Sequence, residues 1–189
     1  LYSSAASDVY KRQGAILHAN SDKNVFIGHE AADATMTAAA DRNVAVGYTA
    51  LSALTSGDRN VAIGAFAGVS NTAAGHLTLL GYNAGYAINH TDADGTVCVG
   101  NEAGAAITSG IGNVAIGFEA LDAAATSDYN TAVGYQSLSA VNGDGDGLNT
   151  AVGRISGNST TSGTSNTYLG AGAGYGNHTG SNNTYVGRN

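Results

Sequence analysis

The sequence predicts a mainly β protein, a parallel β-solenoid (β-roll) of about ten coils with 17–19 residues each. Three observations predict it: a five-residue unit recurs, its spacing is short, and its residues alternate with period two. The unit reads Asn–(Val/Thr)–x–(Ile/Val/Leu)–Gly. Its glycines are Gly28, Gly47, Gly64, Gly81, Gly100, Gly117, Gly134, Gly153, Gly170 and Gly187. A βαβ unit needs about 30 residues, so a unit this short fits one solenoid coil.

The spacing of the glycines is itself periodic. The intervals run 19, 17 and 17 residues and then repeat, which gives a super-repeat of 53 residues. This order indicates duplication of a three-unit block. One coil per unit, stacked at about 4.8 Å, predicts a rod about 43 Å long over nine intervals.

Alternation before each glycine predicts the strands. The residue before glycine is always aliphatic, and the residue two positions earlier is always β-branched. Period-two alternation of such residues is typical of strands. We expect both columns to point into the core. The predicted parallel, in-register strands are 25–27, 44–46, 61–63, 78–80, 97–99, 114–116, 131–133, 150–152, 167–169 and 184–186.

The residue between these two columns is expected to face outward. None of its ten members is charged: they are Phe26, Ala45, Ala62, Leu79, Cys98, Ala115, Ala132, Ala151, Tyr168 and Tyr185. A strand that is apolar on both faces is covered on both faces. The column therefore predicts an interface between subunits and a homotrimer. The alternative is a small, featureless exposed face.

Two further columns mark the corners of the coil. Asn lies four residues before glycine in eight of ten units, where it predicts either an amide ladder or only a turn residue. The third residue after glycine is always small, which predicts close packing between coils. Residues 48–54 and 135–141 lack alternation, which allows short helical turns after the repeat glycines without requiring them.

The chain divides into three parts. Residues 1–13 resemble translated adapter DNA at the ends of shotgun reading frames, or else form a disordered tail. Residues 14–23 are expected to be a partial leading coil, and residues 24–189 a single solenoid domain truncated at its C-terminus. We interpret the whole as an internal fragment of a longer protein.

Composition excludes several classes of partner. Seven Lys and Arg face 14 Asp and Glu, with no basic stripe, so nucleic acid is a poor partner. No apolar run approaches the roughly 20 residues that span a bilayer, so membrane insertion is not expected. The single cysteine, Cys98, excludes an intrachain disulfide and a Cys-rich zinc site.

No catalytic or cofactor motif emerges, so we expect neither an enzyme nor a cofactor. The histidines occupy unrelated positions of the unit: His18, His29, His76, His90 and His178. The glycine run at 172–176 lacks the helix that a phosphate site requires. Residues 142–147, N-G-D-G-D-G, resemble the start of a calcium loop, but its late bidentate Glu is missing. A turn rich in Gly and Asp is the alternative.

Every third unit carries two extra residues. A coil must keep its length to stay in register with its neighbours, so the surplus should bulge outward as surface loops. We expect the bulges at 36–41, 89–94 and 142–147, along one edge at intervals of about 14 Å. They are the first candidates for a contact with a partner or calcium; otherwise they are inherited spacers.

The repeat resembles a known kind of protein. N-T-A-V-G-Y-Q-S-L at 130–138, N-V-A-V-G-Y-T-A-L at 43–51 and N-V-A-I-G at 60–64 and 113–117 resemble repeats in bacteriophage tail fibres. They are more loosely similar to the head repeats of trimeric autotransporter adhesins, whose coils are shorter. The resemblance covers residues 24–189. It implies a trimeric virion or extracellular fibre that attaches to a cell-surface receptor or glycan on a host.

Ice binding is the rival function. Regular solenoids with flat threonine arrays can bind ice, and Thr131, Thr150, Thr167 and Thr184 share one column. By the expected alternation, however, that column points into the core. A solenoid enzyme is a further alternative, but no catalytic cluster supports it.

Overall fold

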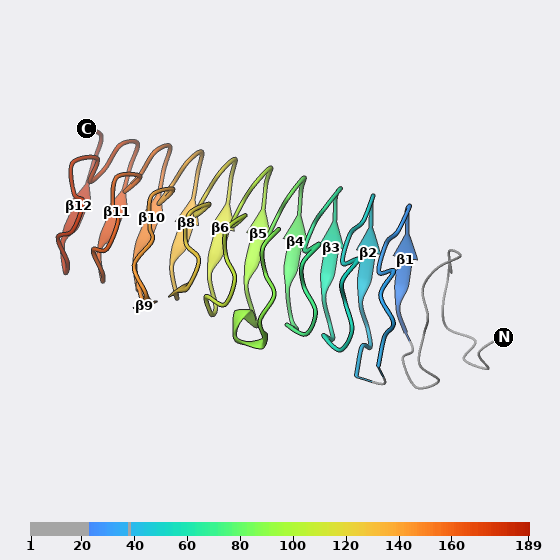
Figure 1. The fold of residues 1–189 in the computed structure, drawn as a ribbon. Coiled ribbons are helices and arrows are strands. Elements are labelled where there is room, and N and C mark those ends of the chain that lie inside the picture. Colours follow the sequence, from blue (N-terminus) through green and yellow to red (C-terminus); the bar gives the residue numbers. More distant parts are fainter. Residues whose placement is uncertain (1–22, 38) are drawn as a thin grey trace, which may run out of the picture.

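The computed structural model describes residues 23–37 and 39–189. These residues form a parallel β-solenoid in which each repeat unit makes one coil (Figure 1). The expected tail at 1–13 lies outside the described residues, as does the leading coil at 14–23 apart from Lys23. The strands of the main sheet are β1 (Val25–Ile27), β2 (Val44–Val46), β3 (Val61–Ile63), β4 (Thr78–Leu80), β5 (Val97–Val99), β6 (Val114–Ile116), β8 (Thr131–Val133), β10 (Thr150–Val152), β11 (Thr167–Leu169) and β12 (Thr184–Val186).

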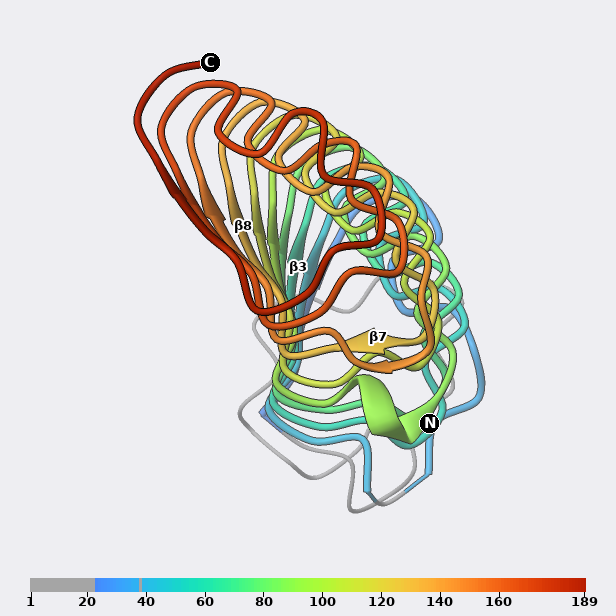
Figure 2. The ribbon, with the colours of Figure 1, turned by 90° about the vertical axis from the view of Figure 1, so that its left-hand side faces the viewer.

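All ten strands coincide with the predicted segments, and all pair in parallel. The register places equivalent residues of successive coils side by side, such as Val25 with Val44 and Thr150 with Thr167. Units of 17 and 19 residues keep the same register. Figure 2 looks along the stack and shows the strands fanning, because parallel strands twist relative to one another.

The strands point their middle residues inward, which reverses the predicted direction. Ala45, Ala62, Cys98 and Ala115 are completely buried, and Phe26 is nearly so. The aliphatic columns on either side of them lie outside. The alternation was therefore predicted correctly, but its phase was wrong. The coil is narrow, and its opposite wall also carries side chains, so most coils have room for only a small residue at the middle position.

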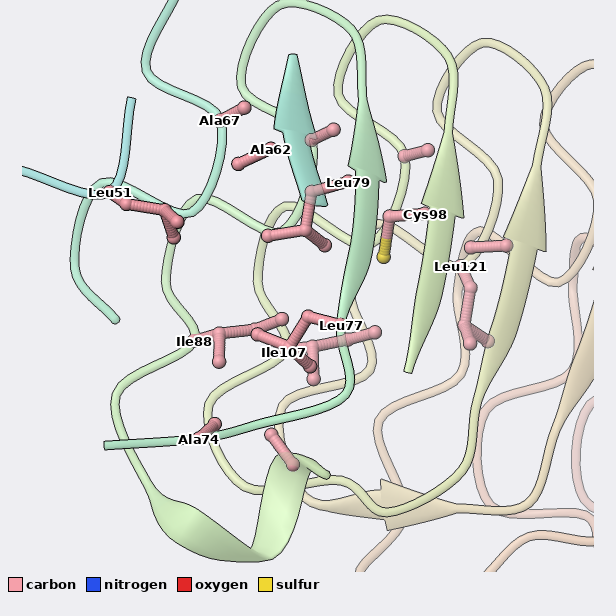
Figure 3. Packing of buried hydrophobic residues seen from close by; sticks show 14 of the residues in the cluster. Leu51, Ala62, Ala67, Ala74, Leu77, Leu79, Ile88, Cys98, Ile107 and Leu121 are labelled. Atoms are coloured by element: carbon pink, nitrogen blue, oxygen red, sulfur yellow. The ribbon is translucent and has the colours of Figure 1, made fainter. Parts of the chain in front are cut away.

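Two columns of the interior compensate for each other in volume. Where the strand contributes Ala, the fourth residue after the repeat glycine can be leucine, as at Leu51, Leu121 and Leu138. Where the strand contributes the larger Leu79, the facing positions are glycines, Gly68 and Gly85. Figure 3 shows Leu79 and Cys98 pointing from β4 and β5 into the interior that they share with other buried residues of the cluster. The small column three residues after glycine is buried as predicted.

The residues after the repeat glycines form consecutive turns rather than the short helical turns that the sequence allows. Their backbone φ is positive at every second position, for example 51° at Thr49 and 50° at Leu51. A helix needs an unbroken run of negative φ. The turns are held by bonds to the neighbouring coils: the Thr49 amide donates to the His29 carbonyl at 2.8 Å, and the Leu51 amide to the Ala67 carbonyl at 3.0 Å.

The asparagine column forms a buried ladder. Asn60 Oδ1 accepts from the Leu77 amide at 3.0 Å, and Asn60 Nδ2 donates to the Ala74 carbonyl at 2.9 Å. Toward the C-terminus the side chains also bond directly, as where Asn166 Nδ2 donates to Asn149 Oδ1 at 3.0 Å. The predicted bonding from amide to amide is confirmed from Asn113 to Asn183, whereas in the earlier coils the side chains bond to backbone groups of the next coil.

The long units bulge at one edge, as predicted. The extra residues of one unit form the 3₁₀ turn η1 (Thr91–Ala93), and those of another contain β9 (Gly145–Asp146), which pairs with β7 (Ser127–Asp128). Figure 1 shows η1, β9 and the loop between β1 and β2 at the same lower edge. The coil core thus keeps its length while the surplus lies outside it.

Candidate functional site

The outer face of the main sheet is an apolar surface that runs along the described coils. The first and third residue of each strand point away from the interior, because the middle residue points inward. In the third position Ile27, Ile63, Ile116, Val152 and Leu169 are 37–49% exposed. These residues were expected in the core, and their exposure makes this face the candidate functional site.

Neither outer column carries a charge. The first column consists of five valines and five threonines, and the third position is always Ile, Val or Leu. Exposed apolar patches on monomeric proteins rarely extend so far without a functional reason. The middle column, on which the sequence predicted an interface, is buried from Phe26 to Tyr168, and the uncharged columns that face outward are the two beside it.

The threonines also point outward, contrary to the sequence-based expectation. Thr150, Thr167 and Thr184 are exposed, and Thr131 is half-buried. The expectation was wrong for the same reason as the phase of the strands. Four successive coils thus present an outward threonine beside an outward aliphatic residue.

An aromatic column borders this face just beyond the repeat glycines. Tyr48, Tyr82, Phe118 and Tyr135 occupy it, and each is close to half exposed. Phe118 and Tyr135 stack with ring centroids 5.4 Å apart, and the Arg154 guanidinium lies 5.9 Å from the centre of the Tyr135 ring. This third column is irregular along the rod, because the other coils place His29, Ala65, Asn101, Arg154, Ala171 or Arg188 here.

The bulged edge carries much of the charge. Asp58 and Arg59 form an ion pair at 2.6 Å, and Arg59 Nη1 lies 3.3 Å from Nε2 of His76 on the next coil. Further along the rod the edge is acidic, with Asp92, Asp94, Asp128, Asp144 and Asp146. This edge is separate from the uncharged sheet face.

The loop at 142–147 was a candidate calcium site. The Thr126 hydroxyl donates to Asp144 Oδ1 at 2.5 Å, and Asp146 lies beside Asp128 in the β7–β9 pair. Within residues 23–37 and 39–189, no group of three or more His, Cys, Asp or Glu is placed to hold a metal ion. The loop remains a candidate on its sequence alone.

Three of the described histidines, His29, His76 and His90, have local side-chain partners. His29 stacks on Tyr48 at 5.5 Å, and His90 lies 3.2 Å from Asp92. A hollow of about 420 Å³ lies at the last coil, lined in part by Tyr175, Tyr185 and Arg188. These groups lie at separate places along the rod, so the described histidines and this hollow do not form one site.

Two acidic groups, the buried Cys98 thiol and the partly buried Asp122 carboxyl, have unusual environments. Burial raises the pKa of the Cys98 thiol to about 12. Burial also raises the pKa of Asp122 to about 6, assisted by repulsion from Glu119 and Glu102, while a backbone hydrogen bond opposes the shift. Asp122 Oδ1 is enclosed and has no hydrogen-bond partner. Both groups lie away from the outer sheet face.

Comparison with protein-family models, curated proteins and solved structures finds no match to this chain. In the described part of the chain, no helix is both long and apolar enough to cross a membrane.

Proposed function

We propose that the chain is a structural and adhesive fibre segment, a repeat shaft or head of a phage tail fibre or surface adhesin. It assembles as a homotrimer outside the cell and contributes to attachment to a host or surface. The observation that carries the proposal is the continuous apolar face along the whole rod. A rod with such a face is suited to lengthwise packing into a fibre.

The bulged edge supports the adhesive part of the proposal. It is polar, it protrudes from the coil, and it lies outside the sheet face that packing would cover. Loops held by a rigid scaffold are where binding groups concentrate. A cell-surface receptor or glycan would contact this edge, and the proposal requires no catalytic group or cofactor.

Binding to cells tests the proposal. Fluorescently labelled full-length chain is incubated with a panel of bacterial cells, and unlabelled chain is added as competitor. We expect saturable, competed binding to at least one cell type. A variant with Asp144→Ser and Asp146→Ser should bind less, while Asp33→Ser, which removes an exposed carboxylate in the turns after a repeat glycine, should not change binding. Absence of saturable binding across the panel would contradict the adhesive role.

Ice binding is the second candidate, favoured by the outward threonines of the last four coils. It is the weaker candidate because the face also contains five valines in the same column and no threonine in the third position. Thermal hysteresis of the full chain tests it. Hysteresis that is lost in Thr167→Lys and kept in Ser162→Lys would favour ice binding over the fibre.

A further inference from the structure

The geometry points to the occupant of the outer sheet face: we propose that a second copy of this chain packs there, parallel and in register. The face consists of the first and third strand columns together with the aromatic column. This inference rests on the proposed fibre and its trimer, and it specifies which surface joins the copies. The proposed interface is thus the outer sheet face, and not the middle column of the strands, where the sequence predicted it.

The size of the face suits a protein–protein interface. The nine intervals of about 4.8 Å between ten coils give a length of about 43 Å. Five residues at about 3.3 Å each, from the first strand column to the aromatic column, give a width of about 17 Å. The product is about 700 Å² per copy, close to the roughly 800 Å² that each partner buries in a standard interface.

The regular spacing of the face favours another copy over an unrelated partner. Its side chains repeat at the strand-stacking distance of about 4.8 Å. A surface interdigitates with such an array over its whole length only if it repeats at the same distance. A second copy meets this condition at every coil. The two strand columns offer no charge to recognise an ionic ligand.

The aromatic column fixes the register. The two strand columns are nearly uniform, so copies displaced by one coil would still bring aliphatic residues together. The column beyond the glycines is not uniform: Tyr48 is followed by Ala65, and Tyr82 by Asn101. A displacement by one coil would place Tyr48 opposite Ala65 and Tyr82 opposite Asn101, so most of the large rings would lose an aromatic partner. In a closed trimer the symmetry axis relates equivalent residues, so the rods run parallel with equal coils at equal height.

Analytical ultracentrifugation of the full chain tests the surface. We expect the wild type to sediment as an assembly at micromolar concentration. Ile63→Asp and Ile116→Asp should each shift it toward the monomer while the far-UV circular dichroism stays unchanged. Ser162→Asp, an exposed residue outside the face, is the matched control and should keep the assembly. A monomeric wild type, or an unchanged mass in both face variants, would overturn the proposal.

Disulfide trapping tests the register without adding a charge. Ile63→Cys and Val152→Cys lie near opposite ends of the rod, and native Cys98 is buried. In parallel, in-register copies each single variant should form a disulfide-linked dimer under mild oxidation. Ser162→Cys should stay largely uncrosslinked. Antiparallel copies would link neither variant to itself, and that result would refute the parallel arrangement.

The two proposals fail in different ways. Assembly through this face without binding to any cell would refute the adhesive function and leave the packing surface intact. A monomer that shows thermal hysteresis would refute the packing surface and support ice binding.

Discussion

Leu79 and Gly85 share one space in the core of the solenoid: a Cβ on Gly85 would lie 2.7 Å from Cδ2 of Leu79. Real Cβ atoms do not approach that closely. Gly85 therefore makes room for the leucine that replaces the usual alanine of the strand. In other coils the arrangement is reversed, since Leu138 and Ala132 are both fully buried.

This relationship predicts reciprocal rescue. Leu79→Ala should destabilise the chain by about 2–5 kcal/mol because it leaves a cavity. Gly85→Leu alone should also destabilise it, because a buried core does not accept extra volume. The double variant Leu79→Ala/Gly85→Leu restores the pairing seen at Leu138, so it should be more stable than either single variant. Urea unfolding followed by circular dichroism gives the free energy of unfolding of the wild type, both single variants and the double variant. If the two single losses of stability simply added in the double variant, the two side chains would not share one space.

The asparagine ladder predicts a large effect from one amide. In Asn60→Ala the buried Leu77 amide loses its hydrogen-bond partner, whereas the Ala74 carbonyl keeps a bond from Asn71 Nδ2. One unsatisfied buried group costs about 1–3 kcal/mol, so we expect a loss of about 1–3 kcal/mol. Exposed Asn101→Ala is the control and should change stability by less than about 0.5 kcal/mol. Equal melting temperatures of the two variants would show that the ladder contributes little.

Much of the fold follows from the sequence, but the direction of the side chains does not. The repeat glycines fix the coil, and ten β-branched positions fix the strands and their register. The prediction of which strand residues point inward was wrong, because exposed Ile63 and buried Leu79 are equally apolar. Hydrophobicity alone therefore does not distinguish the inner column from the outer columns. The pairing of Leu79 with Gly85, and of Ala with Leu elsewhere, is the signal that identifies the inner column. The candidate face could have been found from that pairing.

The thiol of Cys98 should be unreactive toward thiol reagents in the folded chain. It is fully buried, and burial raises its pKa to about 12, so almost no thiolate exists at pH 8. We expect no reaction with Ellman's reagent under native conditions and one equivalent after unfolding in guanidinium chloride. The variant Ser162→Cys, exposed on the same rod, should react at once. Rapid labelling of wild-type Cys98 would mean that the coils open readily near β5.

Asp122 should make stability depend on pH. Its pKa is 3.8 in the reference state and about 6 in the folded chain, mainly because burial disfavours the charged form. The folded state therefore binds the proton more tightly than the unfolded state. The resulting stabilisation is complete below about pH 3.8 and is lost as the pH rises through about 6.

Replacing the carboxyl with an amide isolates this contribution. Asp122→Asn should raise the stability above pH 6, by about 1 kcal/mol because solvent screens a group that is only partly enclosed. Near pH 4 the variant and the wild type should differ little. Asp33 occupies the same position of its own coil and is exposed, so Asp33→Asn is the matched control. Melting temperatures of both variants and the wild type, measured from pH 4 to pH 8, test this prediction. If Asp122→Asn raised the melting temperature equally at pH 4 and pH 8, ionisation of this carboxyl would not be the cause of the increase.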